Sequence, residues 1–469
     1  MSQNRVMPRN IFSIFLVGTI LAILLMPIQA LYTPALAESS EPELWAVFVG
    51  VTEPQCPFCI FDTEWNVYPV QLKHPDDNAR DMAAQLLPVT DQDHIKIVLN
   101  EEGTNAGIYY AIKWLAENAG ANDTALFYFC GHSAFENLGS YDYLVEASQL
   151  AEWFDGIHAE KVVVILDTCY AGSFSKELGQ NGRVVLMSCQ QLESSLEDRD
   201  LQHAVFTHYV LEALRDFSGA DTNGNYELSA EEIFDYAGPK TVNEIVAPFA
   251  NLAAFSSGNI QHPTLYIPPY KYNEINLFMK VIFHTDAESA SDTTVLKADG
   301  KSYLPKELPV SFDWLSGTTH RFEITTPIAT GEGTRLLFTS WSDGDASTER
   351  DISRGGEYAA NYEAQYQLTV ESPYGNPRGS GWYDSGSQAT VSIRTDDGNI
   401  IQHTFTGWSG DYTGLDANMS LTMDKTKTIK ANWKSDYLRL YLLIIGLIIV
   451  VAGTTAVFKI RKKKTPSEY

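Results

Sequence analysis

The chain has few cysteines and few basic residues for its length. Only five of its 469 residues are cysteine, and acidic residues outnumber Lys and Arg by 59 to 33, which gives a formal net charge of −26. Because nucleic-acid binding relies on Lys and Arg to neutralise phosphate, this balance excludes nucleic acid as an expected partner. An acidic surface instead favours solubility and attracts cations or basic peptides.

Long apolar runs are confined to the two ends of the chain. Arg5 and Arg9 precede an apolar run over residues 11–26, and small residues follow as far as Ala37. This order of basic, apolar and small residues is typical of a secretory signal. We therefore expect residues 1–37 to be a signal peptide, with an uncleaved anchor helix as the alternative.

The second apolar run, residues 440–458, is long enough to cross a membrane as one helix. Lys459 and Arg461 follow it and begin a basic tail, residues 459–469, which the positive-inside rule places in the cytoplasm. The sequence therefore predicts a single-pass protein of the cell membrane, anchored through this C-terminal helix, with residues 38–434 outside the cell.

The cysteines do not have the spacing of a zinc site. Cys56 and Cys59 form a C-x-x-C pair, but a structural zinc site needs four ligands and the chain has no second pair of this kind. An odd number of cysteines also leaves at least one thiol unpaired within the chain. Outside the cell, we expect Cys56 and Cys59 to form a local disulfide.

Short apolar runs alternate with helical patterns over residues 38–270, which we take as the first globular domain. The expected strands are 44–50, 95–99, 125–130, 161–167 and 183–189, and the expected helices are 76–87, 104–118, 147–154 and 205–215. This alternation predicts an α/β fold with a mostly parallel sheet and helices on both faces. Ligands bind such sheets at the carboxyl ends of the strands.

From residue 274 onward, short strands and polar turns replace the helical patterns, and the chain repeats itself. Trp341 and Trp408 occupy equivalent places in similar segments, 67 residues apart (408 − 341). We predict two small all-β modules, residues 274–364 and 365–434, in which the tryptophans are core residues. These copies resemble the divergent β-repeat modules of bacterial and archaeal surface proteins.

His132 and Cys169 have a spacing that suits thiol chemistry. Each follows an apolar strand by two residues, and one helical pattern lies between them. Adjacent parallel strands would bring both side chains to the same edge of the sheet. A thiol peptidase needs a cysteine activated by a histidine, with N–H donors for the oxyanion. The same pattern also fits a structural histidine and a core cysteine.

The segments around these two residues resemble the signature blocks of the caspase-like cysteine peptidases. The first is Phe-Cys-Gly-His-Ser at 129–133, and the second is Ile-Leu-Asp-Thr-Cys-Tyr-Ala-Gly-Ser-Phe at 165–174. The prokaryotic metacaspase-like branch is nearest, and the legumains are more distant. The resemblance implies a caspase-like fold, His132 as general base, Cys169 as nucleophile, a polypeptide substrate and no cofactor for the chemistry.

The same resemblance assigns the groups around the reacting bond. The backbone N–H groups of Ser133 and Cys169 would form the oxyanion hole. Asp167, two residues before the nucleophile, would line the pocket for the substrate side chain that precedes the scissile bond. A carboxylate in a partly desolvated pocket prefers Arg or Lys. A capping role for Asp167 at the end of its strand is the alternative.

Asp77, Cys130 and Ser188 are the remaining pocket residues that the resemblance implies. The sequence departs from the family pattern at three places. Ser133 stands where the family usually has Gly, Cys130 replaces a common Ser, and Asn78 stands where an acidic residue is usual. These departures weaken the expectation of a basic preference, whereas the His–Cys pair is intact.

Residues 221–232 have oxygen donors at the spacing of an EF-hand calcium loop. The expected ligands are Asp221, Asn223, Asn225, Glu227 through its carbonyl, Ser229 and Glu232. Tyr226 replaces the usual Gly, so we expect a weak site suited to the millimolar calcium found outside cells. A capping box between Ser229 and Glu232 at the start of a helix is the alternative.

The sequence as a whole predicts a membrane-anchored extracellular cysteine endopeptidase that cuts after a basic residue. One alternative is a surface adhesion or binding protein whose peptidase domain has lost activity. Another is a transpeptidase, because hydrolysis and acyl transfer to an amine share one acyl-enzyme.

Overall fold

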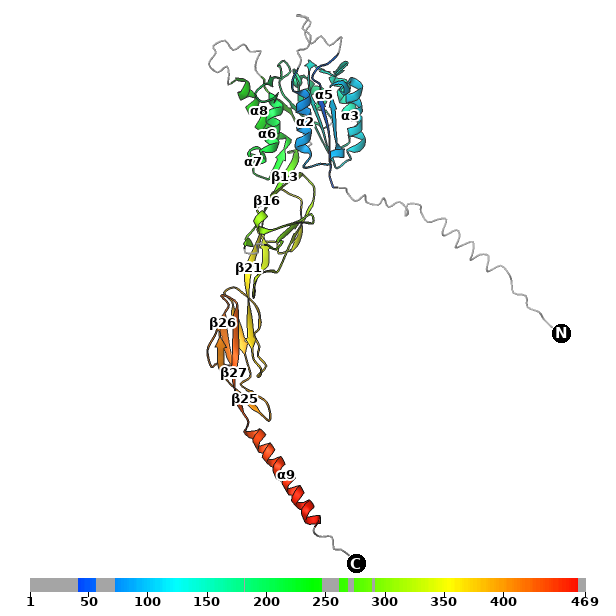
Figure 1. Cartoon of the computed structure of the whole chain (residues 1–469). Helices are drawn as coiled ribbons and strands as arrows, with labels where there is room; N and C mark the ends of the chain where they lie inside the picture. Colours follow the sequence, from blue (N-terminus) through cyan, green and yellow to red (C-terminus); the bar gives the residue numbers. More distant parts are fainter. Residues whose placement is uncertain are drawn as a thin grey trace, which may run out of the picture. The chain divides into compact units, whose positions relative to one another are not determined.

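The computed structural model describes residues 41–55, 72–180, 182–246, 261–268, 274–288 and 292–462. It divides into two compact units: unit 1 is Met1–Asn223 with Leu228–Phe278, and unit 2 is Gly224–Glu227 with Met279–Tyr469 (Figure 1). The predicted signal peptide, the Cys56–Cys59 pair and residues 463–469 of the basic tail lie outside the described residues.

A six-stranded sheet with the order β12-β8-β7-β3-β1-β2 forms the centre of unit 1. Its strands are β1 (Leu44–Gly50), β2 (Ile95–Leu99), β3 (Thr124–Cys130), β7 (Lys161–Asp167), β8 (Val184–Met187) and β12 (Thr264–Tyr266). All neighbouring strands pair in parallel except β12, which lies antiparallel to β8 at one edge. The predicted mostly parallel sheet is confirmed.

Helices cover both faces of this sheet (Figure 1). The longer ones are α2 (Pro75–Leu86), α3 (Asn105–Asn118), α4 (Ala147–Phe154), α6 (Val205–Arg215) and α8 (Ala230–Val246). Val162, Val164 and Leu166 of β7 pack with α3 and α4, whereas Val163 and Ile165 face α2, α6 and α8. Successive residues of β7 thus bury opposite faces, which explains why its sequence is apolar throughout.

Short elements follow the carboxyl ends of the central strands. They are β4 (Ser133–Ala134), β5 (Asn137–Gly139), β6 (Leu144–Glu146), α5 (Ser175–Leu178), β9 (Glu197–Asp198) and β10 (His203–Ala204). Two further short elements, α7 (Phe217–Ala220) and β11 (Glu227–Ser229), lie between α6 and α8 in the chain. β4, β5 and β6 form a small antiparallel sheet between β3 and α4. The loop that follows β3 is therefore itself a folded hairpin.

Unit 2 is built of β-strands up to its terminal helix. The strands are β13 (Asn276–Thr285), β14 (Leu296–Ala298), β15 (Lys301–Tyr303), β16 (Val310–Leu315), β17 (His320–Ile324), β18 (Ile328–Gly331), β19 (Thr334–Trp341), β20 (Glu349–Ile352), β21 (Gly356–Glu371), β22 (Gly381–Asp384), β23 (Gln388–Ser392), β24 (Asp396–Asp397), β25 (Gln402–Gly410), β26 (Asn418–Thr422) and β27 (Lys427–Asp436).

These strands enclose two hydrophobic clusters, and β21 contributes to both. Ala360 and Tyr362 belong to the first cluster, and Leu368 and Val370 belong to the second. The module boundary predicted between residues 364 and 365 therefore lies within a continuous strand. The predicted β-rich repeat region is confirmed.

The repeated tryptophans are buried at equivalent places in the two clusters. Trp341 is 1% exposed and donates its Nε1–H to the carbonyl of Ser347 at 2.8 Å. Trp408 is 4% exposed and donates its Nε1–H to the carbonyl of Asp416 at 2.9 Å. Because the indole N–H finds a partner within its own repeat, each ring can be buried without an unsatisfied donor.

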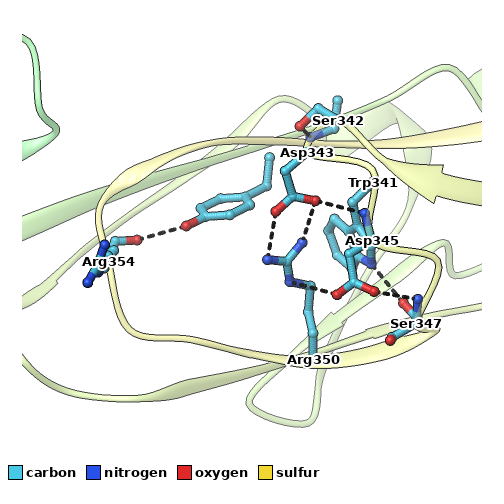
Figure 2. A network of polar contacts seen from close by, with 9 residues as sticks. Trp341, Ser342, Asp343, Asp345, Ser347, Arg350 and Arg354 are labelled. Carbon is cyan, nitrogen blue, oxygen red and sulfur yellow. Dashed lines mark hydrogen bonds and ion pairs between the residues drawn. The ribbon is translucent and has the colours of Figure 1, made fainter.

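An ionic network surrounds the tryptophan of the first repeat. Figure 2 shows the Arg350 guanidinium between Asp343 and Asp345, with Nη2 2.8 Å from Oδ2 of Asp343. The same guanidinium lies 5.1 Å from the ring centroid of Trp341. Its hydrogen bonds hold the pKa of Asp343 below its ordinary range. Gly410 and Tyr412 stand at the equivalent places of the second repeat, so the network belongs to the first repeat alone.

Helix α9 (Leu438–Lys462) begins two residues after β27 ends. Its stretch Leu438–Arg461 has a mean hydropathy of 2.5 over its most apolar window, and none of that window is buried. It is the single helix in the described part of the chain that is long and apolar enough to cross a membrane.

Candidate active site

The pairing of β3 and β7 brings the loops of His132 and Cys169 together. Cys130 and Asp167 lie opposite each other in this parallel pair, and each candidate residue follows its strand by two positions. Thr168 Oγ1 donates to the carbonyl of Gly131 at 2.7 Å, and the Ser133 hydroxyl donates to the carbonyl of Cys169. These bonds hold the two loops side by side at the carboxyl edge of the sheet.

The turn that follows Cys169 depends on a left-handed residue. Tyr170 has a φ of 54°, a conformation that non-glycine residues adopt at a cost in free energy. Gly172, two residues further along, is needed for a different reason. A Cβ at Gly172 would lie 2.7 Å from the backbone nitrogen of Gln191, so a side chain there would displace this neighbouring backbone.

The Cys169 thiol is half-buried and lies against the segment 193–196. Its Sγ is 3.7 Å from the carbonyl oxygen of Ser195, to which the S–H can donate. The backbone N–H of Tyr170 donates to the carbonyl of Glu193 at 2.7 Å. Burial raises the pKa of the Cys169 thiol, so the thiol is protonated at neutral pH and needs a base to become a nucleophile.

Sequence reasoning missed the segment 193–196 because it belongs to no regular element and carries no apolar period. Gln261 holds the segment in place: its Oε1 accepts the N–H of Leu196 at 3.0 Å, and its Nε2 donates to Ser195 Oγ at 3.1 Å. His262 lies 2.8 Å from the Glu193 carboxylate. Gln261 and His262, which lie shortly before β12, therefore hold the segment 193–196 against the candidate nucleophile.

The Asp167 carboxylate points into the interior of unit 1 and is 2% exposed. Its Oδ1 accepts the Ser195 hydroxyl at 2.5 Å, and its Oδ2 accepts the N–H and hydroxyl of Thr207 at 2.9 and 2.6 Å. Burial raises the pKa of Asp167 above its ordinary range. A substrate side chain would therefore reach this carboxylate only by taking the place of the Ser195 hydroxyl.

Of the other predicted pocket residues, Cys130 and Ser188 lie near Asp167 and Asp77 does not. Cys130 is buried and its Sγ accepts a hydrogen bond from Asn78 Nδ2 at 3.3 Å. Ser188 is also buried, where its Oγ accepts the N–H of Thr168 at 3.1 Å. Asp77, by contrast, is exposed to solvent. The α2 residue that meets the end of β3 is thus Asn78 rather than Asp77.

The predicted calcium loop contains the capping box that was the alternative. Glu232 Oε2 accepts the N–H of Ser229 at 3.1 Å, and Ser229 Oγ accepts the N–H of Glu232 at 3.1 Å. Glu232 Oε1 accepts the N–H of Thr222 at 3.0 Å. Over the described ranges, no group of three or more His, Cys, Asp or Glu side chains is arranged to hold a metal ion. Calcium binding stays a prediction.

Two family models match the chain. Residues 81–222 match the Peptidase C13 family, and this range contains both His132 and Cys169. Residues 366–437 match the divergent InlB B-repeat domain. No curated protein is similar enough to the chain to count as a match.

Several solved structures resemble part of the chain at low identity. The protein GSU0716 from Geobacter sulfurreducens is 14% identical with a TM-score of 0.34, over 48% of this chain and 94% of that one. Caspase-1 from Spodoptera frugiperda is 10% identical with a TM-score of 0.33, over 48% of this chain and 86% of that one. The chain therefore joins an α/β region that matches the Peptidase C13 family to a β-rich region that matches the divergent InlB B-repeat domain.

Proposed function

We propose that the chain is a cysteine endopeptidase in which Cys169 is the nucleophile and His132 the general base. The observation that carries this proposal is the register of β3 and β7, which sets Cys130 opposite Asp167 and so brings the two following loops to one edge of the sheet. The hydrogen bond from Thr168 to Gly131 ties these loops one residue before each candidate. The Peptidase C13 match over residues 81–222 supports the same reaction class.

In the proposed reaction, His132 removes the proton from Cys169 and the thiolate attacks the carbonyl carbon of the substrate. The N–H groups of Ser133 and Cys169 donate to the oxyanion that forms. As the C–N bond breaks, His132 returns the proton to the leaving amine, and an acyl-enzyme remains on Cys169. Water activated by His132 then releases the acid product. Because burial raises the pKa of Cys169, the rate depends on His132.

For the residue that precedes the scissile bond, we propose Arg or Lys. Asp167 is the support: its carboxylate lies at the end of β7 with the Ser195 hydroxyl on its Oδ1. A basic head group that displaced this hydroxyl would meet a carboxylate in a desolvated setting, where a charge-assisted hydrogen bond is strong.

We further propose that α9 anchors the protein in a membrane with residues 38–434 outside the cell. Its apolar length and the basic residues that follow it support this orientation. Cysteine-directed labelling of intact cells would test it. A single cysteine introduced at Ser387 should react with a membrane-impermeant maleimide, whereas one introduced at Ser467 should not.

The enzymatic proposal is tested with the full-length protein in detergent micelles. Wild type, Cys169→Ala and His132→Gln are compared on peptidyl-aminomethylcoumarins that end in Arg, Lys, Asn or Asp. We expect turnover after Arg or Lys that both variants lose. Product masses with and without an added amine separate hydrolysis from transpeptidation. Absence of turnover, together with failure of a thiol-directed acyloxymethyl ketone to label Cys169, would favour the adhesion alternative.

A further inference from the structure

An aromatic pair lies directly beside the candidate catalytic residues. The rings of Phe135 and Tyr170 are stacked, with centroids 4.8 Å apart and planes inclined by 21°. Phe135 lies three residues after His132, and Tyr170 follows Cys169 directly. One ring therefore comes from each of the two loops that carry the reacting groups.

Folding alone does not account for this pair. Phe135 is 56% exposed, so its ring gains little from burial. Phe135 and Tyr170 both have left-handed backbones, with φ values of 50° and 54°. Non-glycine residues adopt this conformation at a cost in free energy, and such strained residues are concentrated at functional sites. An exposed aromatic ring held on a strained turn is better explained by contact with a ligand.

The strand order places the Phe135 ring of this pair on one side of the nucleophile. In the sequence β8-β7-β3 across the sheet, Cys169 follows the middle strand. The segment 193–196, which follows β8, presents Ser195 to Cys169 and Asp167. Phe135 follows β3 and so lies on the opposite flank. A peptide whose residue before the scissile bond faces Ser195 and Asp167 would place the residue after that bond toward the Phe135 side of the aromatic pair.

We propose that Phe135 and Tyr170 form a subsite for the residue that follows the scissile bond, and that this subsite selects an apolar or aromatic side chain. Stacked rings offer a flat, uncharged surface, on which Leu or Phe can bury area that Ser or Asp cannot. The inference rests on the proposed peptidase function and adds a preference on the leaving-group side to it.

The test uses two substrate series with the full-length protein. Peptidyl-aminomethylcoumarins have no amino acid after the scissile bond and report the peptidase reaction by itself. Internally quenched peptides that differ only in the residue after that bond, which is Leu, Phe, Ser or Asp, report the subsite. For the wild type we expect kcat/KM for Leu or Phe to exceed that for Ser by about tenfold, as for other hydrophobic pockets.

Two variants remove the ring of Phe135. Phe135→Ala deletes it, and Phe135→Asn deletes it with a residue that tolerates the left-handed backbone, which guards against a misfolded loop. Both should reduce the ratio of kcat/KM for Leu to that for Ser to about threefold or less, and Phe135→Tyr should restore it. Tyr110→Ala removes an equally exposed aromatic ring from α3 and should leave the ratio unchanged.

The outcomes are separable. Turnover of the coumarin series by the wild type with no preference for Leu or Phe would overturn the subsite and leave the peptidase standing. An unchanged ratio in Phe135→Asn would also overturn it. If the wild type hydrolysed neither series, the proposed function would fail and the subsite with it.

Discussion

Thr168 and Gly131 are joined by a hydrogen bond of 2.7 Å from the threonine hydroxyl to the glycine carbonyl. These are the residues that immediately precede Cys169 and His132, so this bond, together with the one from the Ser133 hydroxyl to the Cys169 carbonyl, fixes the separation of the two loops. Its donor is buried, which means that no water can replace it if the hydroxyl is lost.

Thr168→Val should therefore impair catalysis more than its small change in shape suggests. We expect kcat/KM on a coumarin substrate to fall by roughly tenfold and the unfolding free energy to drop by about 1–2 kcal/mol, because the Gly131 carbonyl is left unpaired. Thr168→Ser keeps the hydroxyl and serves as the control. An equal loss of activity in both variants would show that the hydrogen bond is not the cause.

The pH dependence of Cys169 alkylation should show whether His132 acts as the base for this thiol. Because burial raises the pKa of this thiol, His132→Gln should react with iodoacetamide only as the pH rises above about 8.5, the ordinary value for a thiol. The wild type should react near neutral pH. Peptide mass mapping identifies the site. Cys189 is an internal control, since burial raises its pKa to about 12. Identical pH profiles for wild type and variant would contradict a base role for His132.

The buried Asp167 carboxyl should make the stability of unit 1 depend on pH. Its pKa is raised in the folded state by burial, so the folded protein binds this proton more tightly than the unfolded chain does. Stability from this group is fully present below its ordinary pKa of about 3.9, and it is lost as the pH rises through the higher folded value.

Asp167→Asn should remove that pH dependence, because the amide cannot ionise. As the pH is raised from 4 to 7, the unfolding free energy of the wild type should fall relative to that of Asp167→Asn. Urea titrations at several pH values measure it. Asp167→Ala leaves the donors of Ser195 and Thr207 unpaired and should cost about 1–3 kcal/mol at any pH. A constant difference for the Asn variant would mean that Asp167 does not titrate in this range.

The stability that Asp343 contributes to the first repeat should depend on pH in the opposite direction. Its pKa is lowered by Arg350, so its contribution to stability is present at neutral pH and lost as the pH falls through the depressed folded value. Arg350→Met should abolish this acid sensitivity and lower the Tm of the repeat without changing turnover at Cys169. Asp343→Asn should give the same flat profile. An acid profile unchanged in both variants would exclude the pair shown in Figure 2 as its source.

Calcium gives a fifth prediction. If residues 221–232 bind it, millimolar calcium should raise the Tm of the wild type, by the linkage of binding to folding, and Asp221→Asn should weaken the effect. Magnesium is the matched control, because it demands a stricter octahedral geometry. An equal rise with both cations, or none with calcium, would leave the loop as the capped helix start that Ser229 and Glu232 form.

The central strands could be predicted because each is a short apolar run between polar residues. β7 begins at Lys161 and ends at Asp167, as its sequence predicts, since both faces are buried and every intervening residue is apolar. The start of α3 could also be predicted, because Thr104 is a typical N-cap residue. Its hydroxyl accepts the N–H of Gly107 at 2.9 Å. β12 was missed because three residues at a sheet edge carry no period.

The candidate site was predictable only where residue type carries the chemistry. His132 and Cys169 could be singled out because few side chains perform their roles. The segment around Ser195 could not, because its contact with the Cys169 thiol is made by a backbone carbonyl that any residue would supply. The strained turn at Tyr170 was also hidden, since a left-handed backbone is normally marked by glycine and this position is tyrosine.

The continuity of β21 bears on how unit 2 would respond to mechanical load. This 16-residue strand enters both hydrophobic clusters, and part of it pairs in parallel with β27, whose end is separated from α9 by one residue. Tension applied at α9 would pull β27 from its carboxyl end while β21 is held from its amino end. In that geometry the hydrogen bonds between the two strands are sheared together rather than opened one by one. A tether built in this way resists extension best along the direction in which a membrane anchor would pull it.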